Sequence, residues 1–279
     1  LRELFLNQKN LNKSFDAVIH FAGLKSVRES VLNPIKYWEF NVKGTINLIQ
    51  VMNEFNCRTI VFSSSASVYG VSNKLFLNEE DPISPVNPYA ATKSVIEKFL
   101  HNLSTNSNEC WRIANLRYFN PIGAHSSGLI GEDPKDMPNN IFPLISKVAS
   151  KKLKELTVFG DDWPTEDGFA VRDYIHVMDL AEGHINALEY LSSNLPQVVN
   201  LNVGTGKGIS VMQLIESFQT INKVKVPYII VGRREGDVAR LVADNSKIKK
   251  LLNWVPRRNI NSMCFDGWKW QQLNPNGYK

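Results

Sequence analysis

The chain has little of several features that would narrow its class. Only three of its 279 residues are cysteines, Cys57, Cys110 and Cys264, an odd number without metal-ligand spacing. This pattern excludes a disulfide framework and a cysteine-based metal centre. We therefore expect reduced thiols in a cytoplasmic protein, and no bound metal.

Long apolar runs and concentrated charge are also lacking. No run approaches the roughly 20 apolar residues of a membrane-spanning helix, so we expect no membrane contact. The net charge is +5, but neighbouring basic residues occur only as isolated pairs such as Lys151-Lys152 and Arg257-Arg258. Without a basic stripe or arm, nucleic acid is not an expected partner. A modest excess of cations suits a small anionic substrate.

Short apolar runs alternate with helical patterns in the first half of the chain. The predicted buried strands cover residues 15–23, 58–63 and 111–118. The predicted helices there cover residues 37–55 and 87–103. This alternation favours an α/β fold with a parallel, doubly wound sheet. Farther on, we expect helices over residues 140–152 and 180–191, and strands over residues 198–204 and 228–231.

One of these helices opens with Asn87-Pro-Tyr-Ala-Ala-Thr-Lys93. Pro88 suits the first turn of a helix, and Asn87 is a good cap before it. Tyr89 and Lys93 are four residues apart and share one helix face. A nearby ammonium favours the phenolate, which makes a tyrosine a usable base. A lysine that merely lies along a packed tyrosine has the same spacing, so the pair alone leaves both interpretations open.

Seven strings occur in an order that resembles a known family. They are His20-Phe-Ala-Gly-Leu-Lys25, Ser63-Ser-Ser-Ala-Ser-Val-Tyr-Gly70, Pro88-Tyr-Ala-Ala-Thr-Lys93, Tyr118-Phe-Asn-Pro-Ile-Gly-Ala-His125, Pro164-Thr-Glu-Asp-Gly168, Val171-Arg-Asp-Tyr-Ile-His-Val-Met-Asp-Leu180 and Gly232-Arg-Arg-Glu-Gly-Asp237. Together they resemble the UDP-glucose 4-epimerase (UDP-galactose 4-epimerase) family of extended short-chain dehydrogenases/reductases. The resemblance covers essentially the whole chain.

The resemblance implies two domains and a homodimer. A Rossmann-like NAD-binding domain would comprise residues 1–121 plus roughly 171–204. A smaller C-terminal α/β domain, residues 122–170 plus 205–279, would bind the UDP-sugar. The family opens with a strand and a Gly-rich dinucleotide turn, which this sequence lacks. We therefore expect about 60 further residues before Leu1, and poor folding of these 279 residues alone because a central strand would be unpaired.

The resemblance also implies a reaction, the interconversion of UDP-glucose and UDP-galactose. Tyr89 would take the proton of the sugar 4-hydroxyl, Ser65 would relay it, and Lys93 would stabilise the phenolate and bind the nicotinamide ribose. Hydride would pass from C4 to NAD and return to the other face of a 4-keto sugar. Ser65 ends a buried strand, where open α/β sheets place ligands.

The implied ligand contacts fall into two groups. For the cofactor NAD they are Phe21, Ala22, Gly23, Leu24, Lys25, Asn41, Ser63, Tyr89, Lys93, Tyr118 and Phe119. For the UDP-sugar they are Ser65, Ala66, Ser67, Tyr89, Asn120, Asn139, Asn140, Ile141, Thr157, Val158, Phe159, Arg172, Arg234, Asp237 and Leu241. Arg172 and Arg234 would hold the diphosphate, because guanidinium matches phosphate bidentately. Phe159 would stack on uracil and Asp237 would accept from the ribose.

Other interpretations remain open for some residues and for the function. Lys25 could be a solvated loop lysine, Asn41 a helix-surface residue, and the two arginines members of surface ion pairs. Leu241 either gates N-acetylated sugars or belongs to the core. For the whole chain the alternatives are a UDP-N-acetylglucosamine 4-epimerase, a dehydratase, or a non-catalytic nucleotide-sensing scaffold. Dehydratases carry Asp-Glu where this sequence has Ala66 and Ser67.

Overall fold

A computed structural model describes residues 1–106, 110–135, 138, 140–234 and 236–278. The described strands form three sheets, ordered β1-β2-β3-β7, β10-β6-β4 with β8 on β6, and β5-β9. Their bounds are β1 Val18–His20, β2 Thr59–Ser65, β3 Arg112–Tyr118, β4 Asn120–Ile122, β5 Leu156–Phe159, β6 Val171–His176, β7 Gln197–Val203, β8 Gly208–Ser210, β9 Tyr228–Val231 and β10 Arg240–Leu241.

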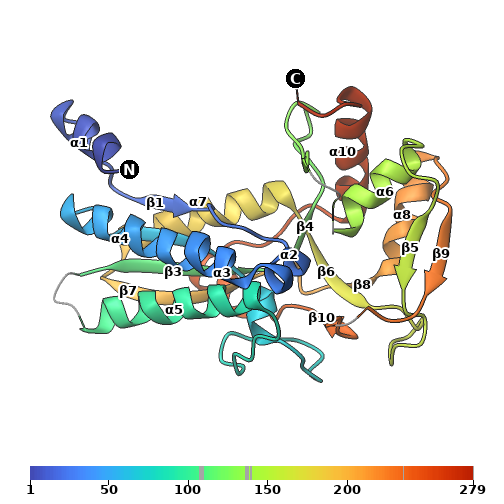
Figure 1. Ribbon diagram of the computed structural model, residues 1–279, viewed down its shortest axis with the longest axis horizontal. Helices are drawn as coiled ribbons and strands as arrows, with labels where there is room; N and C mark the ends of the chain where they lie inside the picture. Colours follow the sequence, from blue (N-terminus) through green and yellow to red (C-terminus); the bar gives the residue numbers. More distant parts are fainter. Residues whose placement is uncertain (107–109, 136–137, 139, 235, 279) are drawn as a thin grey trace.

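The helices lie on both sides of the first sheet and around the other two (Figure 1). Their bounds are α1 Arg2–Asn10, α2 Val27–Leu32, α3 Pro34–Tyr37, the π-helix η1 Trp38–Lys43, α4 Gly44–Glu54, the 3₁₀-helix η2 Ala66–Tyr69, α5 Pro88–Asn106, α6 Ile141–Ala149, α7 Val177–Ser193, α8 Val211–Asn222, α9 Ser246–Leu252 and α10 Ile260–Leu273.

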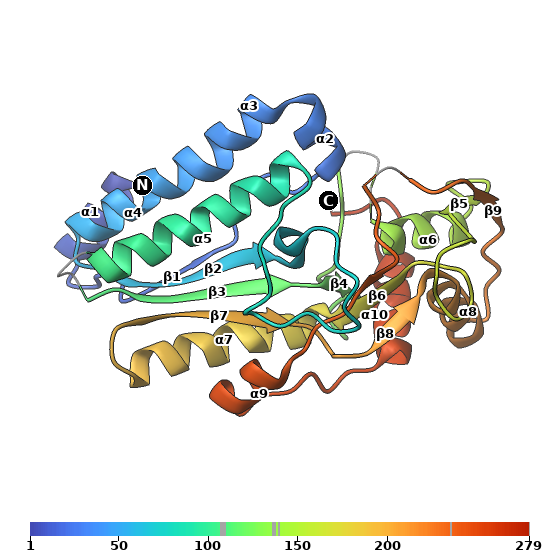
Figure 2. The same ribbon diagram turned by 90° about the horizontal axis from the view of Figure 1, so that it is seen from below.

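The first sheet is parallel throughout, as the sequence predicts. Its strands are rich in β-branched and apolar residues, because α4 and α5 cover one face while α7 and α9 cover the other (Figure 2). The carboxyl ends of β2, β3 and β7 all point toward the half that contains α6, α8, β5 and β9 (Figure 2). Any side chain at those strand ends therefore lies between the two halves of the molecule.

A second core fills the other half. It joins Ile122 of β4, Tyr174 of β6 and apolar side chains of α6, α8 and α10. The short strand β4 follows β3 after one residue and pairs with β6, with Asn120 opposite Tyr174. The strands β4 and β6 thus carry the chain from the first sheet into the second core.

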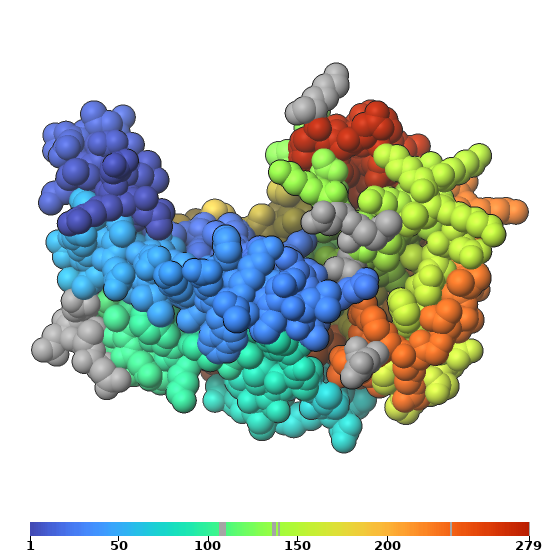
Figure 3. All heavy atoms as spheres, viewed as in Figure 1, coloured from blue at the N-terminus to red at the C-terminus, as the bar shows by residue number. Residues whose placement is uncertain are grey.

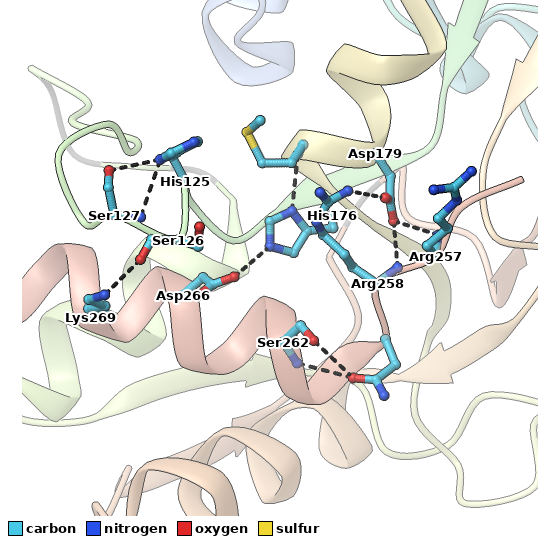
Figure 4. Close-up of polar contacts among 12 residues, drawn as sticks. His125, Ser126, Ser127, His176, Asp179, Arg257, Arg258, Ser262, Asp266 and Lys269 are labelled. Atoms are coloured by element: carbon cyan, nitrogen blue, oxygen red, sulfur yellow. Dashed lines mark hydrogen bonds and ion pairs between the residues drawn. The ribbon is translucent and has the colours of Figure 1, made fainter.

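Two buried acid–base pairs fasten the C-terminal helix to this junction (Figure 4). The backbone N–H of Met178 donates to His176 Nδ1, so the neutral ring carries its proton on Nε2 and donates to Asp266 of α10 at 3.2 Å. Asp179, fully buried at the start of α7, accepts from the side chain and backbone N–H of Arg258. The two contacts join the end of β6 and the start of α7 to residues near the end of the chain.

The predicted elements of the first half are confirmed, with two differences. The strand predicted over residues 15–23 is only Val18–His20, and the helix predicted over 37–55 contains the π-helical segment η1. In the second half β4, β5, β6, β8 and β10 were not predicted as strands. Among the described residues, no helix is long and apolar enough to cross a membrane. Helix α1 stands out from the body, separated from the C-terminal half by a broad hollow (Figure 3).

Candidate active site

The carboxyl end of β2 and the first turns of α5 bring the three predicted catalytic residues together. Asn87 caps α5 through a hydrogen bond from Ala90 N to Asn87 Oδ1 at 2.9 Å. Tyr89 on the first turn faces the hydroxyl of Ser65, which ends β2. Burial raises the pKa of Tyr89, and the hydroxyl of Ser65 opposes this shift. The structure therefore pairs a tyrosine with a serine hydroxyl that can carry its proton.

Lys93 lies one turn beyond Tyr89 and is almost completely buried. Its Nζ donates to the backbone carbonyl of Ser63 at 2.7 Å and is 5.9 Å from the centre of the Tyr89 ring. Burial lowers the pKa of Lys93 to about 8, although the carboxylate of Glu97 raises it. A cation at this distance favours the phenolate of Tyr89 over the phenol.

The loop after β1 is held against this centre by Asn41. The amide Oδ1 of Asn41 accepts from Leu24 N at 2.7 Å, and its Nδ2 donates to Leu24 O at 3.0 Å and to Thr92 Oγ1 at 3.2 Å. Thr92 Oγ1 in turn donates to Tyr89 O. Asn41 belongs to the π-helix η1, a type of helix that is frequent at functional sites. Its amide fixes the loop relative to the tyrosine.

Tyr118, at the end of β3, is oriented by a histidine of α7. His184 Nδ1 donates to Leu180 O at 2.8 Å, so Nε2 of the neutral ring accepts from the Tyr118 hydroxyl. Burial lowers the pKa of His184, which favours this neutral form. The exposed ring of Phe21 lies 4.7 Å from the His184 ring, centre to centre. Phe21 and Tyr118, two of the predicted NAD contacts, thus share one histidine.

The predicted diphosphate residues also lie together. Arg234 is 2.8 Å and Arg172 is 4.0 Å from Asp237 Oδ1. The guanidinium of Arg234 lies 5.6 Å from the centre of the Phe159 ring. Arg172 also donates to the carbonyls of Val171 and Val238. This arrangement agrees with both expectations for the arginines, a surface ion pair and a diphosphate site. Asp237 pairs with both guanidinium groups, and other N–H groups of the two arginines remain available to an anion.

The remaining predicted residues occupy the junction or its surroundings. In β5, Thr157 and Phe159 are exposed while Val158 points into the second core, so Val158 offers only its backbone. Leu241 is half-buried, and Ala66 and Phe119 are buried in the same cluster. Ala22, Gly23 and Lys25 are exposed, Asn140 is exposed, and Ser67 and Ile141 are half-buried. Asn139 lies outside the described residues.

Two features of the site fit a nicotinamide and a sugar. A Cβ at Gly23 would lie 3.1 Å from Asn41 Oδ1 and 3.8 Å from Lys93 Nζ, so only glycine leaves this approach open. Within the part of the chain that the structure describes, the side-chain oxygen of Asn120 is buried without a hydrogen-bond partner. An orphaned acceptor of this kind has a cost that a bound hydroxyl would remove. The residues present therefore suit the ligands that the sequence implies.

Sequence reasoning missed three residues of the site. His184 orients Tyr118, Glu97 faces Lys93, and Arg233 pairs with Asp162 and lies 4.2 Å from the Trp163 ring centre. Only Glu97 carried a local signal, since it follows Lys93 by four residues on the same helix face. The other contacts span 66 and 71 residues of sequence, which no local pattern could reveal.

The buried His20 predicts a loss of stability in acid. Thr45 Oγ1 donates to Asn41 O, so His20 Nε2 donates to Thr45 Oγ1 at 2.9 Å. Burial, helped by the charge of Lys93, lowers the pKa of His20 to about 4. In the unfolded chain, His20 takes up its second ring proton near pH 6.5. The stabilisation of the folded state by the neutral ring is therefore complete above pH 6.5 and is lost as the pH falls toward 4. We expect this group to remove roughly 3 kcal/mol over that range.

Urea titrations of wild type and His20→Gln at pH 7 and 4.5 measure this effect. Gln can still donate to Thr45, so the variant should lose less free energy of unfolding on acidification, by about 2–3 kcal/mol. His101→Gln, at an exposed position of α5, is the control and should behave as wild type. Equal acid sensitivity of wild type and His20→Gln would contradict the assignment.

Comparison with known proteins agrees with the class that this fold and site define. Residues 5–266 match the family model described as GDP-mannose 4,6 dehydratase. The chain therefore belongs to the extended short-chain dehydrogenases/reductases that act on nucleotide sugars. Within that class it belongs to the UDP-glucose 4-epimerase family. It is 50% identical to a UDP-glucose 4-epimerase of Bacillus subtilis over 265 residues, which cover 95% of this chain and 77% of that relative.

Solved structures support the same family. A UDP-glucose 4-epimerase from Stenotrophomonas maltophila, with bound NAD and formylated UDP-arabinopyranose, is 43% identical with a TM-score of 0.94. The match covers 98% of this chain and 82% of that one. The enzyme from Bifidobacterium longum, in complex with NAD⁺ and UDP, is 44% identical with a TM-score of 0.92, covering 99% and 82%. The predicted family and fold class are thus confirmed.

Proposed function

We propose that this protein interconverts UDP-glucose and UDP-galactose by inverting C4 of the sugar. The observation that carries the proposal is the contact of Tyr89 with Ser65 beside Lys93. The pairing of Arg172 and Arg234 with Asp237 adds to it. Inversion at C4 has no leaving group, so the centre must become planar and be rebuilt. A base at the 4-hydroxyl and an anchor for the diphosphate are the two parts that this requires.

Each catalytic residue has a distinct task. Ser65 hydrogen-bonds the 4-hydroxyl and passes its proton to Tyr89, while Lys93 holds the phenolate charge. NAD, when bound beside these residues, would supply the hydride acceptor and donor for C4. Gly23, Leu24 and Tyr118 form the wall on which the nicotinamide would rest. Because hydride and proton both return, the cofactor is neither consumed nor released in a cycle.

Arg172 and Arg234 hold the diphosphate while the 4-keto ring turns. When phosphate enters, Asp237 can exchange its contact with Arg234 for the uridine ribose, and Phe159 can stack on uracil. The exposed face of β5 and the two guanidinium groups supply this surface. Asn120 and Leu241 lie nearer the sugar, where β4 and β10 flank β6.

A dehydratase is less well supported by the residues at the end of β2. Elimination of water across C5–C6 needs an additional acid and base next to the active-site hydroxyl. Ala66 is buried among apolar side chains, and Ser67 hydrogen-bonds Ser65 at 2.8 Å. Neither residue can protonate a leaving hydroxyl, so the site is equipped for oxidation and return at C4 alone.

The direct test is conversion of UDP-galactose by the purified protein with NAD, followed by a coupled assay for UDP-glucose. We expect turnover without net NADH release. A protein that binds NAD and UDP-sugar but forms no UDP-glucose would instead be a sensing scaffold. Formation of a 4-keto-6-deoxy sugar would support a dehydratase.

We further propose the division into an NAD-binding domain, residues 1–121 plus roughly 171–204, and a UDP-sugar-binding domain. The separate cores under the first sheet and around α6, α8 and α10 support it. The strand β6 contributes Ile175 to the first core and Tyr174 to the second, so this strand lies at the boundary between the two domains. Among the described residues, Cys57, Cys110 and Cys264 form no disulfide, which supports a reducing compartment such as the cytoplasm.

A homodimer is proposed from the outer surface of α3, η1 and α5. These helices pack side by side. Ile35, Trp38, Phe40 and Val95 are exposed there, with Phe40 at 59%. Large exposed apolar side chains gathered on one face are typical of protein–protein interfaces. A second copy of the chain, docked through the same helices, would cover them symmetrically.

Phe40→Glu should convert the dimer into a monomer, because it places a charge in the apolar face. Sedimentation equilibrium of wild type and variant measures the change. Phe265→Glu, which alters an equally exposed phenylalanine on α10, is the matched control and should remain dimeric. A monomeric wild type, or a dimeric Phe40→Glu variant, would contradict the proposal.

A further inference from the structure

A buried polar network lies directly behind the catalytic residues. Its members come from β2, η2, the loop before α5, α5 itself, β3 and β7. They are Ser64, Tyr69, Glu79, Glu97, Arg117 and Asn202, all buried. Nothing in the chemistry proposed above uses them. We refer to these six residues as the Glu97 network.

At its centre, Arg117 and Glu97 form a two-pronged ion pair. Arg117 Nη2 donates to Glu97 Oε2 at 2.7 Å, and Nε lies 3.1 Å from Oε1 and 3.2 Å from Oε2. Their side chains are 3% and 7% exposed. Such a pair is costly to desolvate and strongly destabilising to break on one side. Its presence behind an active site therefore needs a reason beyond simple stability.

The rest of the network locks the arginine in place. Arg117 Nη1 donates to the hydroxyl of Tyr69 at 3.0 Å and to the backbone carbonyl of Glu79 at 3.0 Å. Tyr69 donates to Asn202 Oδ1 at 2.6 Å, and Asn202 N donates to Glu79 Oε1 at 2.7 Å. Arg117 thus makes contacts with all three of its nitrogen atoms and has one orientation.

The same carboxylate grips the strand that carries Ser65. Ser64 Oγ donates to Glu97 Oε1, and the Cα of Ser64 is paired with that of Arg117 across β2 and β3. One turn earlier on α5, Lys93 donates to the carbonyl of the preceding residue, Ser63. Two side chains four residues apart on one helix therefore hold two consecutive residues of the strand end. The next residue is Ser65.

The charge of Glu97 also faces Lys93. Several other groups surround that ammonium: His20 from β1, Tyr89 from α5 and the ring of Phe62 from β2, with Tyr118 of β3 near Tyr89. Burial keeps the pKa of His20 low, which leaves it neutral, and burial raises the pKa of both tyrosines. Glu97 is thus the anionic group that favours the charged form of Lys93.

We propose that Glu97 is a positioning residue for the C4 chemistry, which holds the Ser63–Ser65 strand end against α5 and keeps Lys93 charged. The proposal rests on the epimerase function argued above. It assigns two separable tasks to one carboxylate. The first task, holding the strand end against α5, acts through Ser64 and sets the Ser65–Tyr89 contact; we call it the clamp. The charge acts through space on Lys93, with Arg117 fixing where the charge sits.

Glu97→Gln tests the charge, because glutamine keeps the shape and one acceptor but removes the anion. The alkaline limb of the kcat profile should move to lower pH by about one unit or more. At pH 8.5 kcat should fall roughly 10-fold, whereas KM for UDP-galactose changes little. Glu97→Asp, which restores the anion, should return the limb toward wild type. If the alkaline limb of the kcat profile did not move in Glu97→Gln, the proposed effect of the Glu97 charge on Lys93 would be overturned.

Asp179→Asn is the matched control. It also removes a buried carboxylate paired with an arginine, Arg258, but at the contact between α7 and the segment before α10 (Figure 4). It should lower stability and leave the pH profile of the folded fraction unchanged. If it shifted the alkaline limb as Glu97→Gln does, the effect would be a general result of losing a buried ion pair, and the proposal would fail.

Ser64→Ala tests the clamp even if Glu97→Gln does not fold. It removes only a hydroxyl, so the charge and the fold persist. We expect kcat to fall several-fold with no shift of the alkaline limb, since the strand end is loosened while Lys93 keeps its neighbour. Wild-type kcat in Ser64→Ala would overturn the clamp. An inactive wild type would refute the proposed function instead, before any variant is compared.

Discussion

Tyr89→Phe is expected to bind UDP-galactose as the wild type does, while its kcat falls roughly 10²- to 10⁴-fold. The variant lacks only the hydroxyl that meets Ser65. The ring remains, so the packing of the first turn of α5 and the Lys93 contact persist. Loss should therefore appear in kcat and not in the dissociation constant for UDP.

The measurement is kcat by coupled assay and UDP affinity by calorimetry for the same preparations. Tyr118→Phe is the matched control, because its hydroxyl donates to His184 and not to the substrate. It should lose much less turnover than Tyr89→Phe. A kcat near wild type in Tyr89→Phe would remove Tyr89 from the chemistry, and an equal loss in both variants would show that any nearby hydroxyl matters.

Leu241→Tyr is expected to abolish activity on UDP-N-acetylglucosamine while sparing UDP-glucose and UDP-galactose. Leu241 is half-buried on β10, paired in register with Arg172. An acetamido group that turns with the 4-keto ring needs room, and overpacking costs about 1–3 kcal/mol. That corresponds to roughly 5- to 150-fold in rate. The wild type should show weak, measurable activity on the N-acetylated sugar.

The test is kcat/KM for both sugar pairs in wild type, Leu241→Tyr and Leu241→Ser. The serine variant should gain activity on UDP-N-acetylglucosamine. Leu241 also packs against the buried cluster around Leu77 and Phe119, so a structural role is a real alternative. Equal losses on both sugars in Leu241→Tyr would show that the residue supports the fold and does not gate the site.

The grouping of the three predicted catalytic residues could be predicted because it depends on local spacing. Tyr89 and Lys93 are one helical turn apart, and Ser65 ends an apolar strand, so a parallel sheet brings them to one edge. The parallel first sheet could also be predicted, because the alternation of strand and helix patterns is a local signal in the sequence. The sequence pattern does not predict the strand β6, because its polar residues Arg172, Asp173 and His176 hide the strand pattern. Those polar side chains are satisfied by partners far along the chain.

Other parts of the site could not be predicted, since their contacts are not local. Glu97 and Arg117 are 20 residues apart and meet only when α5 packs on β3. Asn41 looked like a helix-surface residue or a cofactor contact, yet it is buried and its amide bonds Leu24 and Thr92. The predicted residues before Leu1, and the poor folding expected without them, stay predictions.

The π-helix η1 has a consequence for insertions and deletions. In an α-helix, residues four apart drift by about 40° around the axis, so Tyr37 and Thr45 would face about 80° apart. The wider turn of η1 keeps Tyr37, Asn41 and Thr45 in one buried row. Deleting one residue within Trp38–Lys43 would therefore rotate the part of the helix before the deletion relative to the part after it. It would leave the apolar side of α4 on the sheet and swing the polar row away from the loop that Asn41 holds. The length of this segment is as constrained as its residues.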